Sequence, residues 1–400
     1  MKFSKLLVFI FIFIPVNINA LEINSEHAIL YNMNEDKVIF EKNSDERTYI
    51  ASLTKIMTTI VAIENIKNVD EIVTVPSIIL DGLVEANASV AGFYPNQKVT
   101  YRDLLYGVLL PSGADATRTL AYYISGNEEE FVKLMNQKAK ELNLVNTNFV
   151  NTSGLDIDNH YSTVKEMSIV LKYALQNPLF KEIYMSNNYT TSDNKLTFKS
   201  VYSKYLSRFN IENKYIYGSK TGYTDLAGYC LSTIANYNNI EYLLITTEAD
   251  AKSDYPLHII DAMMIYDYYT ANYRYLDIIN KNDTLLTLDA KYTKEKYLEI
   301  KSDIDIPKYL NININKTDFK FIYDGLEEIS YFTDKGQIGT LNIVLYNEII
   351  ETIPIIYDGN LTFSLIDFIS NNLIFFLPIV LIPLIISVLI ILKNKKQLSK

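Results

Sequence analysis

The stretch Ala51-Ser-Leu-Thr-Lys-Ile-Met-Thr58 opens the first long helix that the sequence predicts. From here apolar residues recur at helical spacing, namely Leu53, Ile56, Met57, Ile60 and Ile63. Residues three apart share a helix face, so the amine of Lys55 can approach the hydroxyl of Ser52. The Ser-x-x-Lys pattern recurs at 162–165 and 192–195, and alone it also fits a helix-capping serine with a solvated lysine. Only the copy at Ser52 begins a helix with an apolar stripe.

Two rarer patterns follow along the chain. Ser112-Gly-Ala114 lies within Leu109-Leu-Pro-Ser-Gly-Ala-Asp-Ala116, and Lys220-Thr-Gly222 lies within Gly218-Ser-Lys-Thr-Gly-Tyr-Thr224. Glycine is scarce, with 13 residues in 400, so chance supplies a Lys-Thr-Gly triplet less freely than Ser-x-x-Lys. The three patterns together, in this order, therefore indicate one site assembled from distant segments.

The segments between these patterns predict an α+β domain. Alternating apolar residues indicate strands at 28–32 and 37–41, and a later hairpin at Tyr229–Ala235 and Ile240–Thr246. Helical periodicity covers 102–125, 128–142, 163–176 and 257–270. An antiparallel sheet with a helical cluster fits this order. After about residue 275, short alternating segments predict a small all-β domain.

The two ends of the chain predict where the protein resides. Residues 1–20 combine a basic start, an apolar run and a small residue at Ala20, which is typical of a signal peptide, with an uncleaved anchor as the alternative. Leu373–Leu392 carries no charge and is long enough to span a bilayer. The basic tail behind it indicates a cytoplasmic C-terminus, so we expect a single-pass protein of the cell membrane with its body extracytoplasmic.

The expected organisation is therefore a signal peptide (1–20), a first domain (21–275), a β-rich domain (276–358), a linker (359–372), a transmembrane helix (373–392) and a cytoplasmic basic tail (393–400).

Composition excludes several classes of function. The formal net charge is −10, and six of the 37 basic residues lie in the two end segments, which contain no Asp or Glu. The body is thus more acidic than the whole, which disfavours nucleic-acid binding. One cysteine, Cys230, and three widely spaced histidines argue against a disulfide framework and against a metal site.

The three patterns resemble the signatures of the serine penicillin-recognising enzymes, Ser-x-x-Lys, Ser-x-Asn and Lys-Thr-Gly. The closer resemblance is to the D-alanyl-D-alanine carboxypeptidases, the low-molecular-mass penicillin-binding proteins, over residues 25–358. It also rests on Asn151-Thr-Ser-Gly-Leu155, on Ala227-Gly-Tyr-Cys-Leu231 and on a β-rich segment containing Lys335-Gly-Gln-Ile-Gly339. It implies a transpeptidase domain of the penicillin-binding-protein and β-lactamase type, followed by the all-β domain.

That resemblance also implies roles for residues. Ser52 would be the nucleophile that attacks a peptidoglycan stem peptide ending in D-Ala-D-Ala, with Lys55 as its base and Ser112 as a proton relay. Substrate would be bound by Lys220, Thr221, Gly222 and Tyr223. Lys55 can act as a base only when neutral, which requires burial and a neighbouring cation, here Lys220. The resemblance implies no cofactor and no metal, and it implies β-lactam antibiotics as covalent inhibitors.

Two departures from the family keep alternatives open. Ala114 stands where the family usually has Asn, and 253–258 lacks an arginine that often helps to bind the substrate carboxylate. The alternatives are a catalytically weak penicillin-binding or wall-binding module, a D,D-endopeptidase and a β-lactamase. A β-lactamase needs a deacylating carboxylate, but Glu166 is interpreted as a solvated helical residue. Asp115, next to Ala114, is expected to point away from the site.

Overall fold

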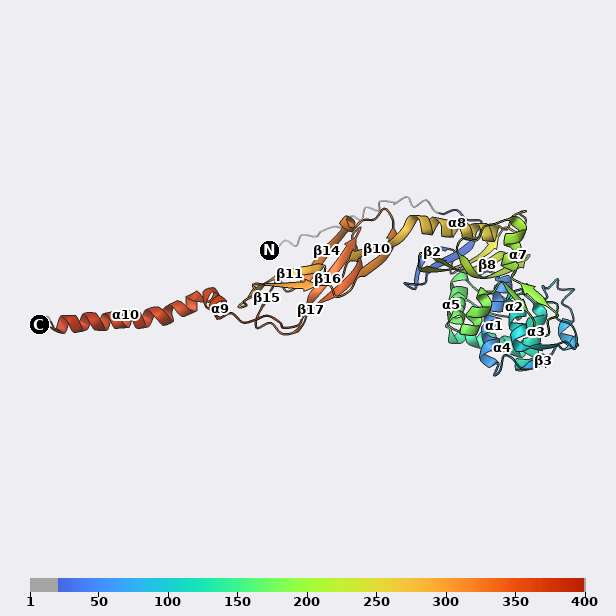
Figure 1. The fold of residues 1–400 in the computed structure, drawn as a ribbon, viewed down its shortest axis with the longest axis horizontal. Helices are drawn as coiled ribbons and strands as arrows, with labels where there is room; N and C mark the ends of the chain where they lie inside the picture. The colour runs from blue at the N-terminus through green and yellow to red at the C-terminus, as the bar shows by residue number, and fades with distance from the viewer. Residues whose placement is uncertain (1–20, 399–400) are drawn as a thin grey trace, which may run out of the picture. The chain divides into compact units, whose positions relative to one another are not determined.

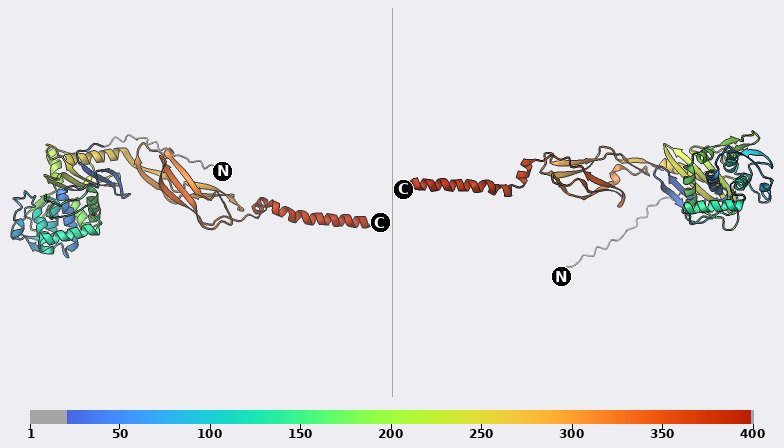
Figure 2. Two further views of the ribbon diagram at one scale, coloured as in Figure 1. Left: turned by 180° about the vertical axis from the view of Figure 1, so that it is seen from behind. Right: turned by 90° about the horizontal axis from the view of Figure 1, so that it is seen from below.

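The computed structural model describes residues 21–398, so the expected signal peptide, 1–20, lies outside the described residues, as do 399–400. The chain divides into two compact units between Tyr269 and Thr270 (Figures 1 and 2). This division falls inside helix α8 (Leu257–Asn272), a few residues before the boundary expected from sequence.

The first unit is built around one antiparallel sheet of five strands in the order β2-β1-β9-β8-β7. Its strands are β1 (His27–Asn32), β2 (Lys37–Lys42), β7 (Ile216–Thr224), β8 (Gly228–Tyr237) and β9 (Ile240–Ala249). The predicted hairpin is confirmed as β8 and β9. Its two-residue turn has positive φ at Asn238 and Asn239, which asparagine tolerates. Strand β7, which carries Lys-Thr-Gly, forms one edge of the sheet.

Helices cover both faces of this sheet (Figure 1). On one face lies α8, whose Tyr266 hydroxyl is 2.7 Å from the Thr233 hydroxyl of β8. On the other lies the helical cluster, where α1 buries Ile56, Met57 and Ile60. The helices of the first unit other than α8 are α1 (Thr54–Asn65), α2 (Tyr101–Leu109), α3 (Ala114–Ser125), α4 (Glu128–Glu141), α5 (Val164–Leu175), α6 (Pro178–Met185) and α7 (Val201–Phe209).

Short elements complete the first unit. They are the 3-10 turns η1 (Ala51–Leu53) and η2 (Ser77–Leu80) and the small strands β3 (Ile72–Thr74), β4 (Lys98–Thr100), β5 (Asn188–Thr190) and β6 (Thr197–Lys199).

The prediction of one helix over 102–125 is wrong. The structure has α2 and α3 instead, separated by 110–113. Pro111 cannot supply the backbone N–H of a continuing helix, and Ser112 has φ +67°, outside the right-handed region. The break therefore places Ser112 at the start of a new helix, where its side chain can face a neighbouring strand.

The second unit is β-rich. It contains β10 (Tyr273–Ile279), β11 (Thr284–Lys291), β12 (Tyr297–Lys301), β13 (Ile306–Asn311), η3 (Lys316–Asp318), β14 (Phe319–Gly325), β15 (Glu328–Ser330), β16 (Gly336–Leu345) and β17 (Glu348–Tyr357). These strands form sheets β10-β13, β12-β11-β15 and β14-β16-β17.

Two helices end the described chain, α9 (Leu365–Asn371) and α10 (Leu373–Leu398). Helix α9 occupies part of the segment expected as a linker. Leu373–Leu392 of α10 has a mean hydropathy of 3.1 and no buried part, so by length and composition it is a candidate membrane span.

Candidate active site

The Ser-x-x-Lys segment forms a tight turn in front of α1. Ser52 lies in η1, and its neighbour Ala51 has φ +43°, an unusual value for a residue with a side chain. Lys55 Nζ lies 3.0 Å from Ser52 Oγ and donates to the Ser153 carbonyl oxygen at 2.6 Å. Ser52 makes no helix-capping hydrogen bond, and Lys55 is only 2% exposed. The alternative of a capping serine with a solvated lysine is therefore wrong.

A second serine–lysine pair joins the other two patterns. Lys220 Nζ donates to Ser112 Oγ at 2.9 Å and to the Thr221 carbonyl oxygen at 2.7 Å. Lys220, Ser112 and Thr221 are all buried. The hydrogen bonds of the described residues connect Ser112 to Lys220 and not to Lys55. A relay through Ser112 would bridge the two lysines, and only its contact with Lys220 is present.

Strand β7 brings the two pairs together at Gly222. A Cβ atom added to Gly222 would lie 3.0 Å from the Ser52 backbone nitrogen and 3.1 Å from the Ala51 Cβ atom. Such contacts are tighter than ordinary packing, so a side chain here would displace the nucleophile turn. Gly222 therefore makes room for the backbone of Ser52, and its expected contact with substrate stays a prediction.

Burial sets the electrostatics of the two amines. Desolvation lowers the pKa of Lys55 to about 7, against the opposing effect of the Asp115 and Glu128 carboxylates. Desolvation, followed by the charge of Lys55, lowers the pKa of Lys220 far below its ordinary value. Among the described residues no carboxylate lies within ion-pair distance of either amine. A neutral Lys55 thus follows mainly from burial rather than from a cation on Lys220.

The loop 151–155 supports the nucleophile turn from the other side. The Asn151 side-chain oxygen accepts from the backbone N–H groups of Ser153, Gly154 and Leu155, at 3.1, 2.6 and 3.2 Å. Gly154 has φ +81°, and a Cβ atom there would lie 1.8 Å from the Ala51 carbonyl oxygen. This loop therefore presents the Ser153 carbonyl to Lys55 and needs glycine at its tightest point.

A cavity of about 470 Å³ opens onto this site. Of the seven residues predicted for the site, Ser52, Lys55 and Tyr223 line this cavity, and Ser112, Lys220, Thr221 and Gly222 are not among its lining residues. Tyr223 is half exposed, and its hydroxyl donates to the Asp225 carboxylate at 2.8 Å. The opposite wall consists of residues that the sequence did not single out, Ala86, Asn87, Ala88, Ser89 and Arg118.

The first turn of α3 holds that opposite wall. The Asp115 carboxylate points away from the cavity, as expected, and accepts from the backbone N–H groups of Ala91, Gly92 and Phe93. Arg118 donates to the Asp81 carbonyl oxygen at 2.7 Å and lies 3.3 Å from the Glu128 carboxylate. Ala114 lines the cavity with no polar side chain. No sequence pattern indicated the wall, because side chains of α3 position it through backbone contacts.

Two buried titratable side chains near the site, Glu166 and His160, form hydrogen bonds that hold neighbouring loops. The prediction that Glu166 is solvated is wrong: it is buried and accepts hydrogen bonds from the Asn146 backbone and the Thr147 hydroxyl. His160 bonds the Thr54 hydroxyl at 2.8 Å and accepts from the Val150 N–H, and burial, followed by the charge of Lys55, lowers its pKa to about 4. Both groups hold loops of the first unit in place.

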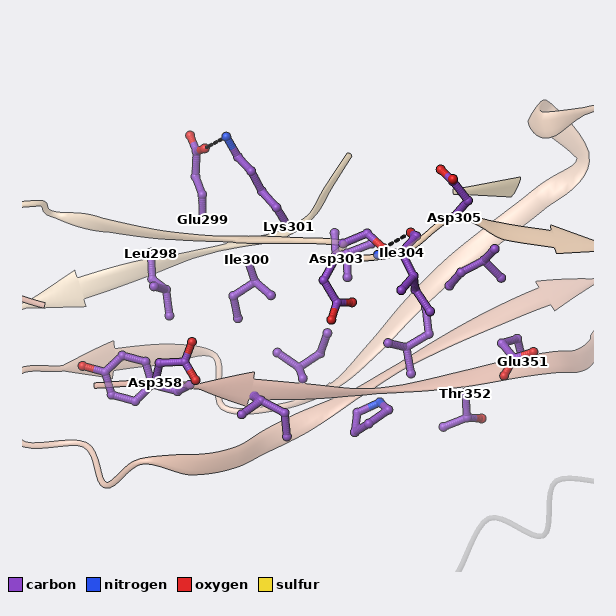
Figure 3. A pocket seen from close by; sticks show the side chains of 18 of the residues that line it. Leu298, Glu299, Ile300, Lys301, Asp303, Ile304, Asp305, Glu351, Thr352 and Asp358 are labelled. Atoms are coloured by element: carbon purple, nitrogen blue, oxygen red, sulfur yellow. Dashed lines mark hydrogen bonds and ion pairs between the residues drawn. The ribbon is translucent and has the colours of Figure 1, made fainter. Parts of the chain in front are cut away.

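The β-rich unit contains a larger groove, of about 760 Å³ (Figure 3). Its wall carries carboxylates, including Asp303, Asp305 and Asp358, above an apolar floor. Its only lysine, Lys301, lies 3.5 Å from the Glu299 carboxylate. Size alone would favour this groove, but it has no buried serine–amine pair, so the smaller cavity is the candidate active site.

Comparison with known proteins identifies the family of the chain. The family model described as D-alanyl-D-alanine carboxypeptidase matches residues 15–251. The chain is 30% identical to D-alanyl-D-alanine carboxypeptidase DacF of Bacillus subtilis, over 83% of this chain and 84% of that protein. It is 27% identical to the carboxypeptidase DacA of Escherichia coli, over 87% and 88%. The crystal structure of penicillin binding protein 5 from Haemophilus influenzae superposes with a TM-score of 0.62 at 25% identity, covering 83% of this chain and 96% of that one.

Proposed function

The chain belongs to the D-alanyl-D-alanine carboxypeptidase family, and from that premise we propose that Ser52 forms the acyl-enzyme through which it works. It is a serine hydrolase that removes the terminal D-alanine from peptidoglycan stem peptides ending in D-Ala-D-Ala. Its fold and its similarity to named carboxypeptidases along most of the chain do not favour a β-lactamase or a non-catalytic binding module.

The observation that carries the mechanism is the buried contact between Lys55 and Ser52. A serine hydroxyl is a poor nucleophile at neutral pH and needs a base within hydrogen-bonding distance. Lys55 Nζ is 3.0 Å from Ser52 Oγ, and its pKa of about 7 leaves a large neutral fraction at physiological pH. Lys55 takes the proton as Ser52 Oγ bonds to the carbonyl carbon of the penultimate D-alanine.

The second amine serves the substrate carboxylate. Lys220 donates to the Ser112 hydroxyl, and burial lowers the pKa of Lys220 far below its ordinary value because it disfavours the charged amine. An arriving carboxylate favours the ammonium form, so substrate binding is coupled to protonation of Lys220. This pairing supplies carboxylate recognition without the arginine that 253–258 lacks.

The reaction then proceeds through acylation of Ser52 and hydrolysis of the resulting ester. The bond between the two D-alanines breaks, and the departing amine takes the proton that Lys55 accepted from Ser52. Ser112, which accepts from Lys220 in the free protein, is the proposed relay for that proton. The backbone N–H groups of Ser52 and Tyr223 stabilise the oxyanion. Water then attacks the ester, giving a proton back to Ser52 Oγ and leaving the shortened stem peptide with a free carboxylate. β-Lactam antibiotics acylate the same oxygen and act as covalent inhibitors.

Labelling with a fluorescent penicillin tests the assignment of the nucleophile. Ser52→Ala should abolish the label and the release of D-alanine from a stem-peptide analogue. Ser192→Ala is the matched control, because Ser192 begins another Ser-x-x-Lys copy and is exposed. Loss of label in neither variant, or in both equally, would contradict the proposal.

We also propose that 21–275 is the catalytic domain, 276–358 a β-rich domain and 373–392 a membrane span. In this arrangement 1–20 is a signal peptide, 359–372 connects the body to the span, and the 393–400 tail is cytoplasmic. The uncharged, exposed surface of the candidate span supports it. The full chain should stay with membranes after a carbonate wash, and a chain ending at residue 372 should be released. Release of both would contradict the span. The expected biological role is in cell-wall synthesis and cell shape.

A further inference from the structure

Six aromatic rings form a continuous cluster where the β-rich unit meets the candidate span. The aromatic cluster consists of Tyr292, Tyr331, Phe332, Phe363, Phe368 and Phe376. The rings of Phe332 and Phe368 are 6.1 Å apart, and those of Tyr331 and Phe363 are 5.2 Å apart. These residues come from the end of β11, the loop after β15, the segment before α9, α9 itself and the first turn of α10, so distant segments converge here.

Two of the six rings are exposed, and the other four are partly buried. Phe332 is 60% exposed and Tyr331 is 44% exposed, and on α9 the adjacent Leu365 and Ile366 are 60% and 83% exposed. A contiguous apolar surface of this kind is unfavourable in water and marks a site of contact with a protein or a lipid. A protein or a lipid surface is therefore expected to cover the aromatic cluster.

The chain fixes the cluster close to the start of the candidate span. The Tyr292 N–H donates to the Asp367 carboxylate of α9 at 2.6 Å, and its carbonyl accepts from Ser364 at 2.9 Å. The Phe368 ring then lies 6.1 Å from the ring of Phe376, in the first turn of α10. If the span enters the bilayer near Leu373, the aromatic cluster lies at the lipid surface.

We propose that the aromatic cluster inserts into the interfacial layer of the membrane and holds the end of the β-rich unit against lipid. This inference rests on the proposed membrane span. Aromatic side chains favour the interface, where apolar rings and polar groups such as the Tyr331 hydroxyl are both accommodated. Lipid is the favoured occupant because the cluster is continuous with a helix that itself requires a bilayer. The β-rich unit thus has a second membrane contact besides the helix.

The chain contains no tryptophan, so single tryptophans report on each position in the full chain. Three variants are reconstituted in phosphatidylcholine vesicles with and without brominated acyl chains: Phe332→Trp in the cluster, Tyr346→Trp as control and Leu381→Trp in the span. Tyr346 is 73% exposed at the far end of β16, about 30 Å along the strand from the cluster. We expect blue-shifted emission and bromolipid quenching at positions 332 and 381, and neither at 346.

The other outcomes separate the two claims. Quenching at 381 without quenching at 332 would overturn the aromatic contact and leave the span intact. A blue shift at 332 without bromolipid quenching would assign the surface to a protein partner or a second copy of the chain, and would overturn the lipid proposal. Absence of quenching at 381 would overturn the span and this inference with it.

Discussion

Two copies of Ser-x-x-Lys in the first unit have the same spacing and different environments. At Ser52 the lysine is buried, lies 3.0 Å from the serine oxygen, and has a pKa lowered to about 7. At Ser162 the serine bonds Thr147, while Lys165 extends into solvent and pairs with Asp45 at 2.8 Å, which raises its pKa. The Ser-x-x-Lys spacing by itself therefore only allows the lysine amine to reach the serine hydroxyl. Burial of the Lys55 amine, which outweighs the opposing charges of Asp115 and Glu128, makes this lysine a base.

The largest effect should come from removing each lysine in turn. Lys55→Met should slow acylation by a fluorescent penicillin about 10²–10⁴-fold, because the general base is lost. Lys165→Met should leave the rate unchanged, because that amine contacts only a surface carboxylate. The measurement is the labelling rate of the full chain under single-turnover conditions. Equal rates for the two variants would break the comparison.

The pH dependence of acylation should report the lowered pKa of Lys55, which Lys165 does not share. The reactive form of Lys55 is neutral, so the rate should fall about tenfold per pH unit below its pKa and level off above about pH 7. Glu128 favours the protonated amine, so Glu128→Gln should move the rise to lower pH. Glu129→Gln, which alters an exposed neighbour, is the control. A profile that falls as pH rises through 7 would contradict Lys55 as the base.

Residues that hold the two Ser-x-x-Lys segments in place should differ in their effect on acylation. Asn151 supports the Ser52 segment, and Thr163 lies in the Ser162 segment. Asn151→Ala leaves three backbone N–H groups without their acceptor, so it should cost about 1–3 kcal/mol and also slow acylation. Thr163→Ala removes the cap of α5 and should cost about 1 kcal/mol with acylation unchanged. Urea unfolding and labelling rates measure both. An Asn151 variant that is destabilised but acylates normally would show that its loop does not position Lys55.

The smallest effect is expected at the surface pair of the second copy. Asp45→Asn removes the partner of Lys165, and exposed ion pairs contribute about 0–1 kcal/mol. Its midpoint of urea unfolding should therefore lie close to that of the unaltered chain. A loss as large as that of Asn151→Ala would show that solvent exposure does not separate the two copies.

The sequence predicts the sheet better than it predicts the walls of the site. The strands β1, β2, β8 and β9 follow from alternating apolar residues, whereas β7 had no such pattern. The nucleophile turn follows from a helix with an apolar stripe. The break before α3 was missed, although Pro111 was a local signal for it. The cavity wall at 86–89 had no signal, because tertiary contacts of α3 position this loop: the Ala114 N–H donates to the Ser89 carbonyl, and Asp115 and Arg118 bond the flanking residues Ala91 and Asp81. Glu166 was wrongly placed in solvent because helical spacing does not reveal which loop packs on that face.

The conformation of Ala51 links folding to reactivity. A residue with a side chain held at φ +43° costs about 1–3 kcal/mol relative to a relaxed turn. Only glycine fits beside this turn at two positions, because a Cβ atom at Gly154 would lie 1.8 Å from the Ala51 carbonyl oxygen and one at Gly222 would lie 3.1 Å from the Ala51 Cβ atom. Substitutions that relax this turn would raise the thermal stability of the protein but lower its turnover. Substitutions meant to raise thermal stability without loss of activity should therefore be made elsewhere in the chain.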